Sequence, residues 1–121
     1  MLIPIERPAV LQGRTYKIQL DHISSALYIT INDIKINNTL RPLELFINTM
    51  EANLQESMST ITRLVSAILR QGENIEFVFK ELEDMFASQP FFYRGKKYHS
   101  IAAIVGELLT EHCKEIGYSD R

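Results

Sequence analysis

The side chains best suited to chemistry in this sequence are three histidines and one cysteine. They are His22, His99, His112 and Cys113. No two of them have the spacing of a zinc-binding pair, and adjacent residues of a helix, such as His112 and Cys113, point in different directions. We therefore expect histidines that lie at the surface or are satisfied within loops, with no bound metal and no cofactor.

Cys113 is the single cysteine of the chain. One thiol cannot form an internal disulfide or a redox pair. A nucleophilic thiol would also need a lowered pKa. Lys114 and His112 are close in the sequence, but no Asn or Asp stands where it would orient the histidine. The expected role of Cys113 is that of a small, half-buried residue near a helix end, and no catalytic residue is predicted.

A group of carboxylates occurs in "ELEDMF", at Glu81, Glu83 and Asp84. Paired carboxylates perform acid–base chemistry when their environments push their pKa values apart. These three fall on the polar side of an amphipathic helical pattern. A solvated helix face is therefore the predicted role.

Three arginines are candidates for binding a phosphate through two parallel hydrogen bonds, namely Arg14, Arg41 and Arg63. Arg63 falls between the apolar residues Ile61 and Leu64, so it is expected at the edge of a helix. No glycine-rich phosphate loop accompanies these arginines. A small-molecule or nucleotide binder is the third of the functions considered.

Three consecutive aromatic residues precede a basic stretch in "PFFYRGKKY". One interpretation is an interaction hairpin for a partner protein or a stacked base, because aromatic residues and arginine are enriched at interfaces. The other is that alternate rings pack into the core while Tyr93 and Arg94 cover it. The candidate partner-contact residues are Phe92, Tyr93 and Arg94.

The composition is that of one ordinary globular domain over residues 1–121, with 45% hydrophobic residues and a net charge of −2. This charge does not favour nucleic acid or an anionic membrane as a partner. The N-terminal stretch lacks the apolar run of a signal peptide, and no apolar stretch reaches the length of a membrane span. We expect a cytoplasmic protein, in the host cytoplasm if a phage encodes it.

Residues 1–12 look like an extended lead-in, because Pro4 and Pro8 disfavour helix. Residues 13–48 predict a β meander. Apolar and polar residues alternate with the period of a strand, as at Leu27, Ile29 and Ile31. Residues 37–42 are expected as a loop before a strand over 43–48.

The apolar period changes to that of a helix after Asn48. Helices are expected over 50–72, 74–87 and 100–117, with a tight hairpin centred on Gly95 between the last two. In the first helix the apolar stripe is Leu54, Met58, Ile61, Val65 and Ile68, which Leu64 and Leu69 widen. Gly72 and Gly117 are expected to end their helices, and Ser100 to cap the start of the third. The order of elements predicts an α+β fold. It would be a small antiparallel sheet of about three strands, plus the short hairpin, packed against three helices.

Six blocks then resemble a known family in their order and spacing. They are "ERPAVLQGRTYKI", "SALYITINDI", "RPLELFIN", "TRLVSAILRQG", "FVFKELEDMF" and "GKKYHSIAAIVGELLTEH". The sequence is similar over about residues 6–117 to the accessory region of adenosylcobalamin-dependent ribonucleotide reductases, either a separate small subunit or a C-terminal extension. The resemblance implies a non-catalytic domain that contacts the reductase large subunit and supports deoxyribonucleotide synthesis.

The sequence departs from that family in three places. Such accessory subunits usually continue into a Cys-rich tail, which this sequence lacks. The Thr-Ser-Cys-Pro-Asp signature of the wider domain group is missing, and "ASQPFFY" stands where the family tends toward Asp-Pro-Arg-Gly-Gly. An alternative is therefore a stand-alone phage or mobile-element protein that binds or inhibits a host protein. Homo-oligomerisation stays open under either function.

Overall fold

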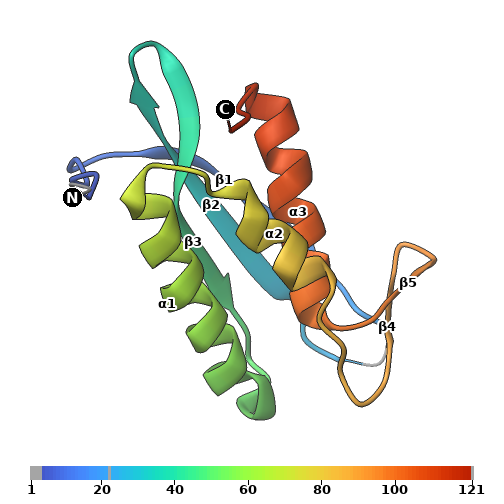
Figure 1. The fold of residues 1–121 in the computed structure, drawn as a ribbon. Helices are drawn as coiled ribbons and strands as arrows, with labels where there is room; N and C mark the ends of the chain where they lie inside the picture. Colours follow the sequence, from blue (N-terminus) through green and yellow to red (C-terminus); the bar gives the residue numbers. More distant parts are fainter. Residues whose placement is uncertain (1–3, 22, 121) are drawn as a thin grey trace.

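Three antiparallel strands form the central sheet, in the order β1–β2–β3 (Figure 1). They are β1 (Gln12–Ile18), β2 (Leu27–Ile36) and β3 (Thr39–Asn48). The structure, a computed structural model, describes residues 4–21 and 23–120. With the two-stranded hairpin and the three helices given below, it confirms the predicted α+β fold.

The turn between β2 and β3 is shorter than the loop expected over 37–42. Only Asn37 and Asn38 lie outside the strands, with φ angles of 51° and 67°. Two left-handed residues make the kind of turn whose twist matches an antiparallel hairpin, and asparagine tolerates this conformation. The following residues therefore pair with β2 directly.

A β-bulge explains how Pro42 fits inside β3. Asn32 pairs with Glu44 and Asp33 pairs with Pro42, so Leu43 has no partner across the ladder. Proline has no N–H to donate and is tolerated at bulges and on edge strands. β3 is an edge strand of this sheet. Pro42 therefore lies at a bulge in an edge strand, where proline is tolerated, and β3 continues on both sides of it.

The remaining elements are a 3₁₀ turn, three helices and a hairpin. They are η1 (Ala52–Leu54), α1 (Gln55–Gln71), α2 (Glu76–Glu83), β4 (Phe91–Tyr93), β5 (Lys96–Tyr98) and α3 (Ile101–Ile116). Each helix is shorter than its predicted range of 50–72, 74–87 or 100–117. At the end of α2, Met85 and Phe86 are exposed and offer no burial that would favour another turn.

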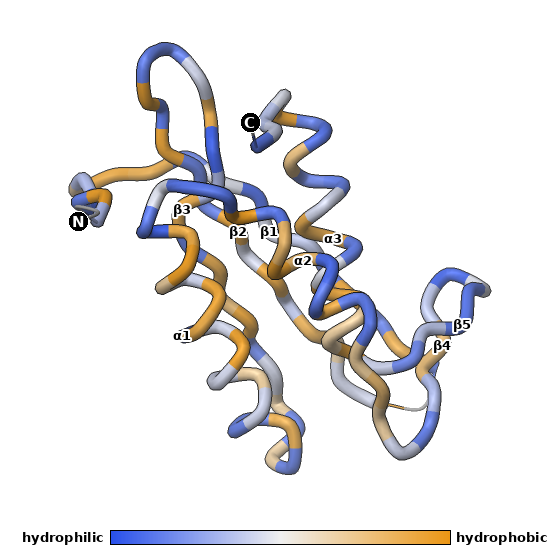
Figure 2. The backbone as a smooth tube through the Cα atoms, in the orientation of Figure 1, coloured by the Kyte–Doolittle hydropathy of each residue, from blue (hydrophilic) through white to orange (hydrophobic). Residues whose placement is uncertain are grey.

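The hydrophobic core lies between the sheet and the helices. The inward side chains of β2 are almost fully buried, namely Leu27, Ile29 and Ile31. Buried residues of β1, β3 and all three α-helices pack against them in one cluster. Figure 2 shows hydrophilic residues at the turn between β2 and β3 and at the turn between β4 and β5, away from this core.

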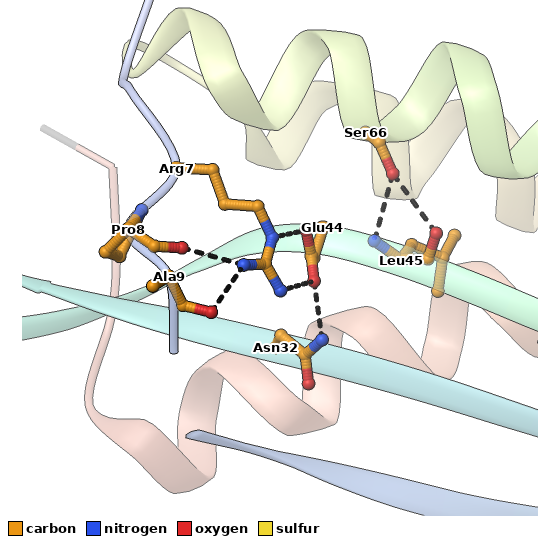
Figure 3. A network of polar contacts seen from close by, with 7 residues as sticks. All are labelled: Arg7, Pro8, Ala9, Asn32, Glu44, Leu45 and Ser66. Atoms are coloured by element: carbon orange, nitrogen blue, oxygen red, sulfur yellow. Dashed lines mark hydrogen bonds and ion pairs between the residues drawn. The ribbon is translucent and has the colours of Figure 1, made fainter. Parts of the chain in front are cut away.

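α1 lies along β3 and covers its free edge. The Ser66 hydroxyl accepts a hydrogen bond from the backbone N–H of Leu45 at 3.0 Å and donates one to its carbonyl oxygen at 3.1 Å (Figure 3). An unpaired strand edge is a site for unwanted pairing with other chains. Here a buried side chain of the helix satisfies both backbone groups.

The buried stripe of α1 follows the predicted residues with one exception, Leu64. Val65 and Ser66 are buried, whereas Leu64, expected to widen the apolar stripe, is 62% exposed. The hydrogen bonds of Ser66 to Leu45 place a polar residue in the interior, where an apolar one would be expected. Gly72 ends the helix in the left-handed conformation, with a φ of 84°, as predicted for a C-terminal cap.

α2 and α3 approach each other closely at Gly106. A Cβ atom built there would lie 2.5 Å from the carbonyl oxygen of Phe79. No real side chain could occupy that space without moving the helices apart. Gly106 is thus the residue that sets their spacing.

The extended N-terminal segment is held on the sheet by an ion pair. Arg7 donates from Nε and Nη2 to the two carboxylate oxygens of Glu44, at 2.9 and 3.1 Å (Figure 3). Asn32 donates to the same carboxylate at 2.6 Å. The hydrogen bond from Arg7 is the main reason that the pKa of Glu44 is lowered, against the opposing effect of its burial.

We predict that aspartate at position 65 destabilises the fold far more than aspartate at position 64. Val65→Asp would place a carboxylate in the core and should lower the free energy of unfolding by several kcal/mol, about 3 or more. Leu64→Asp, one residue away on the same helix, should change it by roughly 0.5 kcal/mol. Urea unfolding of both variants measures this. Equal midpoints would show that the face of α1 is misplaced.

We also predict that the Arg7–Glu44 pair makes stability depend on pH. The pKa of Glu44 is lower in the folded chain than in the unfolded chain. The charged pair therefore stabilises the fold above the unfolded pKa of about 4.3, and this contribution is lost as pH falls through the folded value. The difference in unfolding free energy between wild type and Glu44→Gln should be largest near neutral pH and shrink in acid. A difference that stays constant across a pH series would contradict the prediction.

Candidate functional site

The predicted contact residues lie on the β4–β5 hairpin. Its turn is Arg94–Gly95, and both residues have positive φ angles, 53° and 74°. Phe92 is 39% exposed and points outward, whereas Tyr93 is half-buried and packs against the core. Arg94 is exposed, and its guanidinium carbon lies over the Tyr93 ring, 5.2 Å from the ring centroid. The structure thus divides the three residues: Phe92 and Arg94 face solvent, and Tyr93 supports them.

The hairpin is fixed to α3 through Glu107. Tyr98 and Lys96 both donate hydrogen bonds to its carboxylate, the latter at 2.7 Å. Burial acts to raise the pKa of Glu107, but these two hydrogen bonds outweigh it and the pKa is lowered. Glu107 therefore stays charged at neutral pH and holds β5 in place.

A second set of contacts holds the segments that enter and leave the hairpin. Ser100 caps the start of α3 by accepting from the N–H of Ala103 at 3.0 Å, as predicted, and its hydroxyl donates to the carbonyl of Met85 at 2.7 Å. The His99 ring stacks on Phe86, with centroids 4.1 Å apart. These contacts fix the segments on both sides of the hairpin.

A cleft of about 770 Å³ lies beside the hairpin. It runs between the first half of α1, the segment after α2 and the start of α3. Its apolar lining residues are Leu54, Met58, Ile61, Met85, Ala87, Phe91, Ile101 and Ala102. The cleft and the hairpin tip together form the candidate contact surface.

Cys113 is buried, and its expected unreactive role agrees with its surroundings. Burial raises the pKa of its thiol to about 12. The thiolate, which is the nucleophilic form, is therefore scarce at neutral pH. Within the residues that the structure describes, no group of three His, Cys, Asp or Glu side chains gathers as metal ligands would.

His112 corrects the expectation of surface histidines, because it is only 1% exposed. Its Nε2 lies 2.8 Å from Oδ1 of Asp33 on β2, and its Nδ1 lies 2.8 Å from the hydroxyl of Tyr16 on β1. His99 is exposed, as expected, and His22 lies outside the described residues. Sequence reasoning missed this cluster because its members are 79 and 96 positions apart.

The Tyr16–His112–Asp33 cluster joins helix to sheet and leaves no group free for catalysis. Burial raises the pKa of Tyr16, against the opposing effect of Arg14, so its phenol keeps the proton that it can donate to Nδ1. The Nε2–H then donates to the Asp33 carboxylate. A general base needs a ring nitrogen within reach of a substrate proton. Both nitrogens of His112 are already engaged.

The other chemical candidates are dispersed. Glu81 and Asp84 are exposed, as expected for a solvated face, and Thr110 on α3 donates to Glu83 at 3.0 Å. Arg14 pairs with Glu115, and Arg63 is exposed on α1. Arg41 differs from both, because it lines a separate pocket.

The structure is a small α+β domain. Its β4–β5 hairpin is exposed at the tip, and hydrogen bonds between Tyr16, His112 and Asp33 join α3 to the sheet. None of the helices in the described part of the chain is both long and apolar enough to cross a bilayer. The model of the TSCPD domain matches residues 4–113 of the 121, so the chain belongs to the TSCPD domain family. This domain is found in class II ribonucleotide reductases and related proteins. No curated protein and no solved structure matches the chain.

We predict that Tyr16→Phe destabilises the fold by about 1–3 kcal/mol, because it leaves the buried Nδ1 of His112 without a donor. Tyr28→Phe is the matched control. Tyr28 is on the neighbouring strand and 43% exposed, so loss of its hydroxyl should cost less than about 0.5 kcal/mol. Urea unfolding distinguishes the two variants. Equal midpoints would mean that the hydrogen bond to His112 contributes nothing.

Proposed function

We propose that the chain is a non-catalytic accessory domain of an adenosylcobalamin-dependent ribonucleotide reductase and acts by protein–protein contact in deoxyribonucleotide synthesis. The match of the TSCPD domain to residues 4–113 is the observation that carries the proposal. The resemblance of six sequence blocks to the accessory region of these reductases supports it.

The cysteine content supports a non-catalytic role. Reduction of a ribonucleotide in this family requires a cysteine that forms a thiyl radical and a pair of cysteines that supplies electrons. The sequence has one cysteine, and burial holds its thiol protonated. The catalytic cysteines would therefore come from the large subunit.

The hairpin tip supports contact as the mode of action. Phe92 and Arg94 are side chains of the types enriched at binding hot spots, and both are exposed at a turn that α3 holds in place. Tyr93 stacks beneath Arg94 and limits its freedom. A side chain that is ordered before binding loses less entropy when the partner docks.

A second candidate function is a stand-alone protein that uses the same fold to bind or inhibit a host protein. The departure of "ASQPFFY" from the family pattern, which includes strand β4 of the hairpin, favours it, as does the missing Thr-Ser-Cys-Pro-Asp signature. Both functions use contact, and they differ in the partner.

We predict that the purified chain binds the large subunit of the class II reductase from the same organism and that Phe92→Ala weakens this binding. Truncation of a true anchor costs about 2 kcal/mol, which is roughly a thirtyfold loss of affinity. Arg94→Gly should also weaken binding, and glycine keeps the left-handed turn that alanine would strain. Titration calorimetry measures the affinities, and thermal unfolding should show little change in Tm.

Phe77→Ala is the matched control, because Phe77 is an exposed phenylalanine at the start of α2. Its truncation should leave affinity unchanged. If wild-type protein does not bind the large subunit, the reductase role is wrong. If it binds but Phe92→Ala and Arg94→Gly bind equally well, the partner is right and the hairpin is not the contact.

A further inference from the structure

A pocket of about 510 Å³ lies on a part of the surface that the β4–β5 hairpin does not line. Three segments line it: the β2–β3 turn, the residues between α1 and α2, and the residues that follow α3. Figure 1 shows these segments at the same end of the molecule. Most of the side chains in its lining are polar, and Arg41 is the basic residue among them.

Arg41 has an unusual environment for a charged residue. Its Nε and Nη2 are buried and have no hydrogen-bond partner among the residues that the structure describes. Its guanidinium carbon lies 5.0 Å from the centre of the Tyr118 ring, a cation–π contact. A ring over the guanidinium cannot accept the hydrogen bonds that its in-plane N–H groups make. Leaving buried donors of a charged group unpaired is costly, so the site favours an added acceptor.

Arg7 in the same protein shows which group the Nε and Nη2 atoms of an arginine can bind together. Its Nε and Nη2 donate to the two oxygens of one carboxylate, that of Glu44. The corresponding two nitrogens of Arg41 are those that lack an acceptor. Two parallel N–H groups match a pair of oxygens on one carboxylate or phosphate.

Asp120 also lines the pocket, but it does not accept a hydrogen bond from Nε or Nη2 of Arg41. Asp120 receives a hydrogen bond on Oδ2 from the N–H of Glu76 at 2.7 Å and on Oδ1 from the Tyr118 hydroxyl at 2.6 Å. Both of its oxygens are therefore engaged in fixing the C-terminal segment to the start of α2. Asp120 and Glu73 in the lining are acidic, so Arg41 is the side chain there that attracts an anionic group.

We propose that this pocket binds the carboxylate or phosphate group of a small molecule, with Arg41 as the anchoring cation. Neutral side chains complete the lining and offer further hydrogen bonds to such a group; they are Asn37, Thr39, Asn74 and Ser119. The proposal is independent of the contact function, because it concerns a different part of the surface.

The test is a titration of ¹⁵N-labelled full chain with inorganic phosphate and, separately, with acetate, at constant ionic strength maintained with chloride. The Nε–H resonance of Arg41 and the amides around residues 37–39 and 118–120 should shift and saturate, with a Kd on the order of 1 mM. Saturation by phosphate alone identifies a phosphate group, and saturation by acetate identifies a carboxylate. If neither probe produces saturable shifts at these residues, the proposal is wrong.

Two variants make the test specific. Arg41→Gln should weaken the binding of the effective probe about tenfold or more, since it removes the charge and the paired donors. Arg63→Gln makes the same change at an exposed arginine and should leave binding unchanged. Undiminished binding to Arg41→Gln would overturn the proposal. If that variant does not fold, the wild-type titration still decides, because the Arg41 resonance itself reports the contact.

Discussion

The burial of Asp33 is the constraint on which the arrangement of the helices depends. A carboxylate removed from water must be hydrogen-bonded or paired, or the fold loses several kcal/mol of stability. Asp33 is on the central strand, and His112 of α3 provides the partner, with Tyr16 of β1 holding the far side of the ring. α3 must therefore lie across the sheet with His112 above Asp33. An apolar contact alone would allow the helix to slide, whereas these hydrogen bonds favour one position.

The positions of the other elements follow from α3. Gly106 admits the backbone of α2 at close range, so α2 packs where α3 allows it. Near its first turn, Ser100 and Glu107 hold the hairpin and the segment before it. Beyond its last turn, Asp120 binds the start of α2 and Tyr118 lies on Arg41. One helix thus positions both the candidate contact surface and the Arg41 pocket, at its two ends.

The sequence was sufficient to predict the elements formed by local patterns. Alternation along β2 and the helical period of α1 and α3 predicted the fold class, and Ser100, Gly72 and Gly117 predicted three helix ends. The failures share a cause. The burial of His112, the inward position of Ser66 and the β-bulge at Leu43 each depend on contacts with another element. A periodicity calculation treats His112 as polar and Leu64 as apolar, so it cannot predict that the former is buried and the latter exposed. The hairpin turn was predictable from Gly95, but the division between outward Phe92 and supporting Tyr93 required the packing against the core.

Membership in the TSCPD domain family explains the interior better than it explains the surfaces. The buried residues of the sheet and helices tolerate few substitutions, because each change of volume or polarity costs stability. Exposed side chains such as Phe92 and Arg94 change at little energetic cost. A chain can therefore keep this fold while its contact residues diverge toward a different partner. For this reason, the choice between a reductase accessory domain and a protein that binds another host target depends on the exposed hairpin and the partner that it fits. The Arg41 pocket is different in kind. Two buried nitrogens of Arg41 have no partner among the described residues and reduce stability unless an acceptor is present, so binding explains their arrangement better than structure does.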